Sequence, residues 1–245
     1  RGGQGQRGAV GERASTDNHN ASRLGKFTRL LVGGAGKVQG AAVGTDVLEQ
    51  SRRVSQCPGG RNFHARYQFI AGGDAAAAAG GFGASMSQLL ALPDAPGAVK
   101  PEAFRYLNQS GRITIDGYDD AAEWQATQKA MVELEFPSDA QAAVNEVLAG
   151  LLHLGMVTFD VPEGAESGAT KDCSKVAAGE SAARMAAVKK LWGLPDHTEH
   201  TLTTRKMHSS RRSVYTMGLK PEQATQAREG VAKAVYHALF KWLVA

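Results

Sequence analysis

The stretch NHNASRLGKF, Asn18 to Phe27, decides the interpretation of this chain. Positions 18–23 offer two asparagine amides, a serine hydroxyl and an arginine guanidinium. By itself this composition is typical of a polar, turn-rich loop that leads into a strand. The next residues, FTRLLV at Phe27 to Val32, predict that strand, and it should end at the glycine pair Gly33 and Gly34.

Six further segments follow in a fixed order. They are LEQSRRV (Leu48 to Val54), RNFHARYQFIAG (Arg61 to Gly72), YLNQSG (Tyr106 to Gly111), IDGYDDAAEW (Ile115 to Trp124), VLAGLLHLG (Val147 to Gly155) and LFKWLV (Leu239 to Val244). Together the seven segments closely resemble the motor head of myosins, where the first is the loop called switch I. The common form of that loop is NxNSSRxGKF. Its matches here are Asn18, Asn20, Ser22, Arg23, Gly25, Lys26 and Phe27, and Ala21 replaces the first serine.

The resemblance implies an α/β, predominantly helical fold: a fragment of the P-loop NTPase-type motor domain with a few strands of its central twisted sheet. Residues 1–10 are glycine-rich and polar, and we interpret them as divergent or disordered. Residues 11–245 resemble the motor domain. Within them, 11–72 correspond to switch I and the sheet region called the transducer, and 73–245 to the upper actin-binding subdomain.

The chain is expected to be a fragment that lacks the family's phosphate-binding loop and second switch. The one look-alike of a phosphate-binding loop is GGAGKV, Gly33 to Val38. Leu31 stands where the first glycine is required, and Val38 replaces the Ser or Thr that would hold magnesium. We therefore predict a turn between strands here. We also expect that this chain alone does not hydrolyse ATP.

Composition is that of an ordinary globular protein, with 42% hydrophobic and 21% charged residues. The net charge of +4 is too small to indicate nucleic-acid binding. Cys57 and Cys173 have neither metal-site spacing nor a disulfide framework, which predicts two reduced thiols in the cytosol. No apolar run is long enough to span a membrane. His64 lies beside aromatic residues and is predicted to be a packed core histidine.

Most of the remaining chain is predicted to be helical. Phe63, Tyr67 and Ile70 give the segment at residues 61–71 one apolar face, and Gly72 to Ser85 reads as a low-complexity surface insertion. Further expectations concern individual helix ends. Asp119 or Asp120 should cap a helix that runs to about Leu134. Ser138 or Asp139 should cap the next helix, which should leave the helical conformation at a left-handed Gly155. A further helix should run from Ser181 to Trp192 and end at Gly193, and the last helix should begin near Pro221.

Two helical faces are predicted to be buried. On the helix that follows Ser138 the stripe is Val144, Val147 or Leu148, and Leu151. On the last helix it is Ala224, Val231, Val235, Leu239 and Trp242.

The resemblance assigns roles within switch I. Ser22 would be a magnesium ligand, Asn18 and Asn20 would contact ATP, and Arg23 would pair with a glutamate of the second switch. Ala21 lacks the hydroxyl that the family uses near the attacking water, which predicts slower hydrolysis but retained nucleotide binding.

The segment at residues 203–219, TTRKMHSSRRSVYTMGL, resembles the family's cardiomyopathy loop, which contacts actin. Arg205, Lys206, Arg211 and Arg212 are the candidate actin contacts, because a basic loop favours an acidic partner. The resemblance also makes Ser213 a candidate phosphorylation site, sixteen positions before EGVAK at Glu229 to Lys233. An unmodified polar loop residue is the alternative for Ser213. Phe159 to Lys171 would be a weaker actin-facing loop.

These expectations leave two functions open. In the first, the whole protein is a cytoplasmic, actin-based motor that couples Mg-ATP hydrolysis to movement along filaments. In the second, it is a non-motor, ATPase-deficient actin-binding protein of myosin ancestry. Ala21, the divergent residues 1–10 and the insertion at Gly72 to Ser85 keep the second open.

Overall fold

The computed structural model describes residues 12–15, 18, 21–22, 24–48, 54–78, 86–91, 99–163, 173–208 and 214–244. Its elements are β1 (Glu12–Arg13), β2 (Ala21–Ser22), β3 (Leu24–Val32), β4 (Val38–Leu48), α2 (His64–Ala78), α3 (Met86–Leu90), η2 (Pro101–Ala103), α4 (Arg105–Asn108), α5 (Asp120–Glu133), α6 (Ser138–Met156), β5 (Phe159–Asp160), β6 (Lys175–Val176), α7 (Glu180–Trp192), α8 (Thr198–Thr203), β7 (Thr204–His208), β8 (Val214–Gly218) and α9 (Pro221–Val244).

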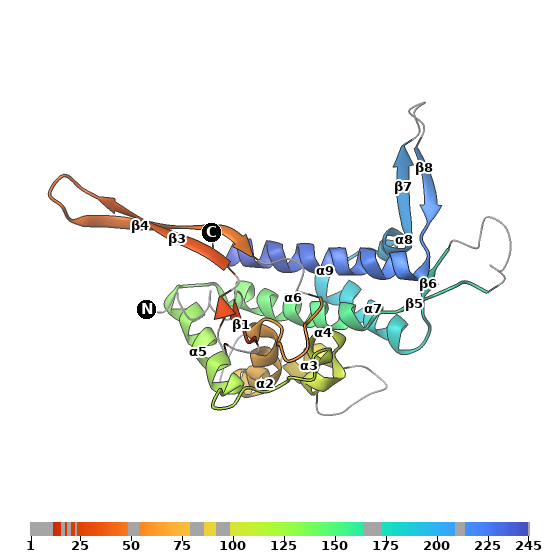
Figure 1. Cartoon of the computed structure of the whole chain (residues 1–245), viewed down its shortest axis with the longest axis horizontal. Helices are drawn as coiled ribbons and strands as arrows, with labels where there is room; N and C mark the ends of the chain where they lie inside the picture. Colours follow the sequence, from red (N-terminus) through yellow and green to blue (C-terminus); the bar gives the residue numbers. More distant parts are fainter. Residues whose placement is uncertain are drawn as a thin grey trace.

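The molecule is a helical body from which two antiparallel ribbons project. The long helices α6 and α9 run side by side, and α2, α3 and α5 lie beneath them (Figure 1). The ribbon of β3 and β4 leaves one end of the body, and the ribbon of β7 and β8 stands upright at the other. Every sheet among the described residues is a two-stranded antiparallel pair. The mixed, mainly helical class is therefore confirmed, whereas membership of a larger twisted sheet stays a prediction.

Helix α6 is the centre of the core. Val144, Leu148 and Leu151 are almost fully buried, as the periodicity predicts. The predicted start is wrong by one or two residues, because Pro137 is the cap and Ser138 already belongs to the helix. The left-handed exit predicted at Gly155 is also wrong. Gly155 is helical and buried, and a Cβ there would lie 2.7 Å from Cδ2 of Tyr106.

Two predicted helix ends are confirmed, one by its hydrogen bonds and the other by its backbone conformation. The carboxylate of Asp119 accepts hydrogen bonds from the backbone N–H groups of Ala121 and Ala122, at 2.9 and 3.1 Å, and so caps α5. Helix α7 ends at Gly193, whose φ of 60° is the left-handed conformation that favours glycine. Both signals are local in sequence, which is why they can be predicted.

Helix α2 extends beyond its predicted end. The segment at Gly72 to Ser85 was expected to be a surface insertion, but the helix continues through Gly72 and Gly73 to Ala78. Both glycines are buried at helix crossings. A Cβ on Gly72 would lie 2.7 Å from Cβ of Trp124 in α5, and one on Gly73 would lie 2.5 Å from Cβ of Met86 in α3. These glycines therefore allow close packing; residues 79–85 lie outside the described part.

The buried face of α9 differs from the predicted stripe. Ala224 and Leu239 are buried as expected, but Val231 and Trp242 are 37% and 48% exposed. The face instead contains Arg228, Ala232 and Tyr236, each with no exposed surface. A stripe predicted from apolar residues alone leaves out arginine and gives tyrosine too little weight. The predicted stripe therefore lies on a different side of α9 from the face that is buried.

The ribbon of β3 and β4 contains the predicted turn at Gly33 to Val38. The N–H of Gly33 donates to the carbonyl of Lys37 at 2.9 Å, and Gly36 has a φ of 73°. Strand β4 follows directly after this turn and runs to Leu48. Several large apolar side chains on the ribbon are about half exposed: Phe27, Leu30, Leu31, Val32 and Val38. None of the described helices is long and apolar enough to cross a membrane.

Two glycine substitutions should change stability in opposite directions. Gly72→Ala puts a methyl group against Trp124, so we expect a loss of about 1–3 kcal/mol of unfolding free energy. Gly230→Ala, in α9, meets nothing within 4 Å and should add about 1 kcal/mol through helix propensity. Urea unfolding of both variants measures the difference. Equal effects would contradict the close packing of α2 on α5.

Candidate functional site

The candidate switch I segment begins as a small hairpin. Strand β1 pairs with β2 in the register Glu12 to Ser22 and Arg13 to Ala21. Between them, the backbone N–H of Ser15 donates to the carbonyl of Asn18 at 2.8 Å. Asn18 and Ser22 are exposed and Ala21 is half-buried. The amide and the hydroxyl to which a nucleotide role was assigned therefore lie at the surface of the same hairpin.

Two of the assigned switch I residues, Asn20 and Arg23, lie outside the described residues. Their predicted roles in nucleotide contact and in the ion pair stay predictions. Among the described residues, no group of three or more His, Cys, Asp or Glu side chains could hold a metal ion. Ser22, the residue predicted to bind magnesium, is itself among the described residues.

The base of this hairpin is attached to the helical body by backbone contacts. The N–H of Arg61 donates to the carbonyl of Ala14 at 2.9 Å, and Arg13 forms a β-bridge with Phe63. Ser110 joins the same region, since its hydroxyl donates to the carbonyl of Gly60. The loop therefore starts from a fixed platform at the N-terminal end of α2.

Beneath the platform lies a cluster of fully buried arginines that the sequence analysis did not predict. Arg13, Arg61, Arg66 and Arg228 expose 1% of their surface or less. A buried charge must be compensated, because transfer from water costs several kcal/mol. Here the compensation comes from the carboxylates of Asp120 and Glu229, from a backbone carbonyl and from aromatic ring faces.

Arg61 uses two of these devices. It forms an ion pair with Asp120, the first residue of α5, and its guanidinium carbon lies 3.8 Å from the ring centroid of Tyr67. The hydroxyl of Tyr67 donates to the carbonyl of Leu107 at 3.0 Å. Burial raises the pKa of Tyr67, so its hydroxyl stays protonated and can donate. Arg61 thereby connects α2 to α5 directly below the loop.

Arg66 of α2 lies near aromatic rings of two other helices. Its guanidinium carbon is 4.8 Å from the ring centroid of Tyr236 in α9 and 5.6 Å from that of Tyr106 in α4. Burial lowers the pKa of Arg66 and raises that of Tyr106. Phe63 also stacks on Tyr236, with ring centroids 5.0 Å apart. These contacts pack α2 directly against α9.

His64 is confirmed as a packed core residue. It is 1% exposed and stacks on Tyr118 with ring centroids 5.1 Å apart. Burial is the main reason that the pKa of Tyr118 is raised to about 12. The hydroxyl of Tyr118 accepts a hydrogen bond from Nε2 of Gln68 at 2.9 Å. The histidine therefore belongs to the packing of α2.

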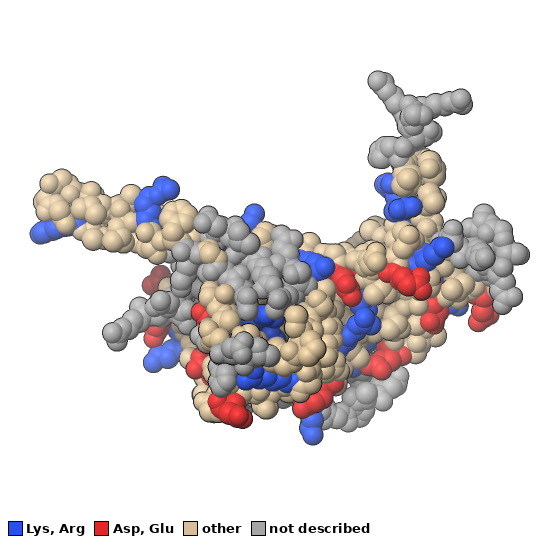
Figure 2. Space-filling view, viewed as in Figure 1, with Lys and Arg blue, Asp and Glu red and all other residues tan. Residues whose placement is uncertain are grey.

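The predicted basic loop is for the most part a ribbon. Arg205 pairs with Met217 and Lys206 with Thr216 in the register of β7 and β8. Because they are neighbours on one strand, Arg205 and Lys206 project from opposite faces, and both are exposed. Figure 2 shows basic atoms on this upright ribbon.

The other predicted residues of this site are not described. Arg211, Arg212 and Ser213 lie outside the described residues, as do residues 164–171 of the second predicted actin-facing loop. Cys57 and Cys173, the two cysteines of the chain, are both free thiols, as expected.

Comparison with known proteins identifies the family of this chain. The family model "Myosin head (motor domain)" matches residues 8–245. The chain belongs to the myosin motor-domain family. It is 31% identical to Myosin-16 of Arabidopsis thaliana, 33% to Unconventional myosin-XV of Homo sapiens and 32% to Myosin-2 of Saccharomyces cerevisiae. Each match covers 96% of this chain, but only 17%, 6% and 13% of those proteins, respectively.

Family membership confirms the interpretation that the ordered motifs suggested. The chain spans less than a fifth of the length of these relatives. What the whole protein binds and catalyses is therefore a separate question. The structure shows what two of the motifs that carried the resemblance contribute to the fold. RNFHARYQFIAG supplies the platform, Arg61 and Arg66, while YLNQSG supplies Tyr106 and Ser110.

Proposed function

We propose that this chain is the part of an actin-based motor that carries switch I and most of the upper actin-binding subdomain. The whole protein would bind Mg-ATP and couple its hydrolysis to movement along actin, in the cytoplasm at the actin cytoskeleton. One observation carries the proposal. Asn18 and Ser22 lie at the surface of one hairpin whose base is attached to the buried core.

The residues of this hairpin suit a phosphoryl-transfer site, where catalysis is mostly positioning and electrostatics. The hydroxyl of Ser22 would contact magnesium, and Asn18 and Asn20 would contact the nucleotide. Magnesium would supply positive charge against the phosphates and take its other ligands from phosphate oxygens and water. Arg23 would close the site through an ion pair outside this chain, for which the planar guanidinium is well suited.

The ribbon of β7 and β8 is the proposed actin contact. Arg205 and Lys206 are exposed on its two faces, and Arg211 and Arg212 follow in the sequence. A basic ribbon on an acidic filament would speed encounter and make affinity dependent on salt. We also propose residues 11–72 as the switch I and transducer region and 73–245 as the upper actin-binding subdomain.

Ser213 is the proposed regulatory position on the same ribbon. It follows Arg211 and Arg212 in the sequence, an arrangement that suits a basophilic kinase. A phosphate group would add about −1.5 to −2 charge next to the proposed actin contact. The change would be local and electrostatic, so it would act on the ribbon without altering the core.

The second candidate function is a non-motor, ATPase-deficient actin-binding protein. Ala21 favours it, because position 21 offers no hydroxyl beside the proposed nucleotide site. The two candidates agree on actin binding and differ in hydrolysis. A full-length protein that binds actin but does not hydrolyse ATP would support the second.

Ala21→Ser in the full-length protein should raise the single-turnover hydrolysis rate by about tenfold, the effect of one hydrogen bond of about 1.4 kcal/mol on the barrier. Binding of a fluorescent ATP analogue should stay unchanged. Ala41→Ser, an equivalent change at an exposed position of β4, is the matched control. Equal hydrolysis rates in wild type and Ala21→Ser would sink the assigned role of position 21.

Lys206→Glu should weaken actin binding by about threefold, the effect of one rim charge, and more strongly at low salt. The control is Lys129→Glu, an exposed lysine on α5 at the opposite end of the body (Figure 1). Co-sedimentation of the full-length protein with actin filaments at two salt concentrations measures both. If the two variants bind alike, the ribbon is not the contact.

Ser213→Glu should give a higher actin-activated ATPase rate than Ser213→Ala, because activity in some classes of this family depends on a negative charge at this position and glutamate imitates part of the phosphate charge. Ser87→Glu and Ser87→Ala, at an exposed position of α3, form the control pair. The measurement is steady-state ATPase activity against actin concentration. Identical curves for the two Ser213 variants would leave this serine an ordinary loop residue.

A further inference from the structure

One side chain, that of Arg112, joins the candidate switch I hairpin to two other parts of the chain. Its Nη1 donates hydrogen bonds to the carbonyl oxygen of Ser15 at 2.8 Å and to that of Gly59 at 3.3 Å. Its backbone N–H donates to Oγ of Ser110 at 3.2 Å. Arg112 and Ser15 are separated by 97 positions in the sequence, so the contact is a product of the fold.

Ser15 in turn holds Asn18. The backbone N–H of Ser15 donates to the carbonyl of Asn18 at 2.8 Å. Its hydroxyl donates to the same oxygen at 3.3 Å and accepts from the N–H of Asn18 at 3.2 Å. Ser15 therefore makes three contacts with the residue proposed to touch the nucleotide, while its own carbonyl is held by Arg112.

We propose that Arg112 is a positioning residue for nucleotide binding, and that it acts through Ser15 to fix the backbone of Asn18. This inference rests on the proposed function of the hairpin. Arg112 itself is not assigned any contact with the nucleotide. It would reduce the entropy that the loop loses when a ligand orders it, which raises affinity by preorganisation.

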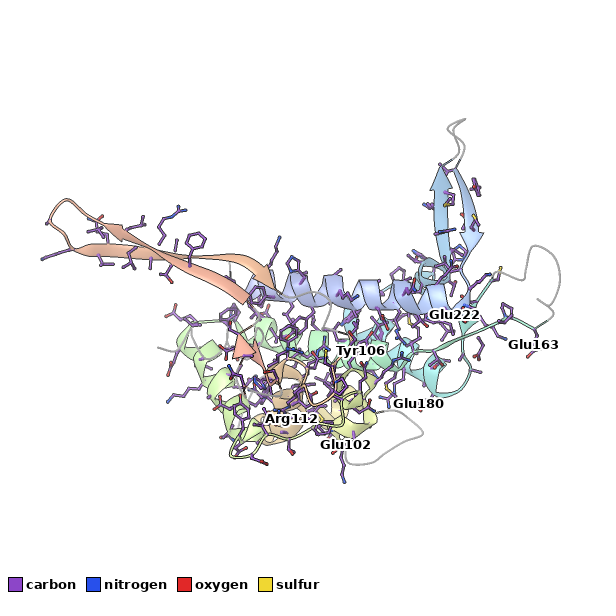
Figure 3. The ribbon with its side chains drawn as sticks, in the orientation of Figure 1. Glu102, Tyr106, Arg112, Glu163, Glu180 and Glu222 are labelled. Atoms are coloured by element: carbon purple, nitrogen blue, oxygen red, sulfur yellow. The ribbon has the colours of Figure 1, made fainter. Side chains whose placement is uncertain are left out.

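Arginine suits this position for a geometric reason. One Nη atom carries two hydrogens, so it can bond two carbonyl oxygens at once. The planar guanidinium holds both bonds in a fixed plane, which the flexible ammonium group of lysine does not. The side chain is partly buried, and charge-assisted bonds are stronger where water is partly excluded. Figure 3 shows Arg112 in the same part of the molecule as β1.

The competing view is that Arg112 only stabilises the junction of three segments. That junction has other bonds, because the N–H of Arg61 donates to Ala14 and the hydroxyl of Ser110 donates to Gly60. A purely structural Arg112 would therefore affect unfolding without a specific effect on Asn18. The two views predict different order in the loop around Asn18 and different affinities for the ligand.

The experiment compares Arg112→Gln, Arg112→Lys, Ser15→Ala and the double variant Arg112→Gln/Ser15→Ala in the full-length protein. Arg105→Gln, an exposed arginine on α4, is the matched control for the loss of one positive charge. The readouts are amide hydrogen exchange of peptides at residues 12–22 without ligand, the dissociation constant of a fluorescent ATP analogue with magnesium, and the thermal midpoint.

Arg112→Gln should speed exchange at residues 12–22 and raise the dissociation constant by about tenfold, the equivalent of one hydrogen bond to a charged group. Arg112→Lys should give a smaller loss, and Arg105→Gln none. The effects of Arg112→Gln and Ser15→Ala should be less than additive, because both act on the same contact. Thermal midpoints identify any variant that is unfolded at the assay temperature.

Three results would overturn the inference: unchanged exchange at residues 12–22, an affinity equal to that of Arg105→Gln, or additive effects with Ser15→Ala. If Arg112→Gln does not fold, Arg112→Lys decides, and wild-type exchange and affinity in that variant would overturn the inference as well. A wild-type protein that binds no nucleotide would instead overturn the proposed function. The exchange data would still decide whether Arg112 holds the hairpin.

Discussion

The structure depends on burying arginine side chains between α2, α4 and α9. Arg66 and Arg228 have no exposed surface, and Glu229, which pairs with Arg228 at 3.4 Å, is about a quarter exposed. The guanidinium of Arg228 donates to the carbonyl of Val157, and that of Arg66 lies near the rings of Tyr106 and Tyr236. A cation over an aromatic face recovers part of the lost hydration, and more of it when water is excluded. The tyrosines must therefore stay in place, which fixes the positions of the three helices.

This constraint explains how the hairpin and the basic ribbon come to be attached to the same helical body. The hairpin is attached at Arg61 and Phe63, at the N-terminal end of α2. Phe63 also stacks on Tyr236, and the helix that contains Tyr236 begins directly after strand β8. A physical route of packed side chains thus joins the two sites. Contact alone does not establish energetic coupling, which requires an element with two arrangements that both sites bias.

Features encoded by neighbouring residues could be predicted from the sequence. The cap at Asp119, the end of α7 at Gly193 and the turn at Gly33 to Val38 each depend on a few consecutive residues. The buried arginines could not be predicted in this way, because their partners lie tens of residues away. One signal was present: Arg228 lies four residues from both Ala224 and Ala232, in the middle of an apolar face. A charged residue in that position indicates a buried partner.

Two of the misjudged helix ends share a physical cause. Glycine was interpreted as a breaker at Gly72 and Gly155, yet both are buried inside helices against Trp124 and Tyr106. A glycine in a helix costs about 1 kcal/mol of propensity, and close packing of a large aromatic ring offsets that cost. Only the tertiary structure shows which of the two effects decides.

The ribbon of β3 and β4 supplies the last step. An isolated two-stranded ribbon is marginally stable in water, and this one leaves Phe27, Leu30 and Leu31 about half exposed. Phe27 and Leu30 differ in strand parity, so apolar groups lie on both faces. Surfaces of this kind are stable when other protein covers both faces, as in the interior of a larger sheet. The ribbon begins two residues after Ser22. A sheet built on it would therefore sense the position of the same hairpin that Arg112 holds at its other end.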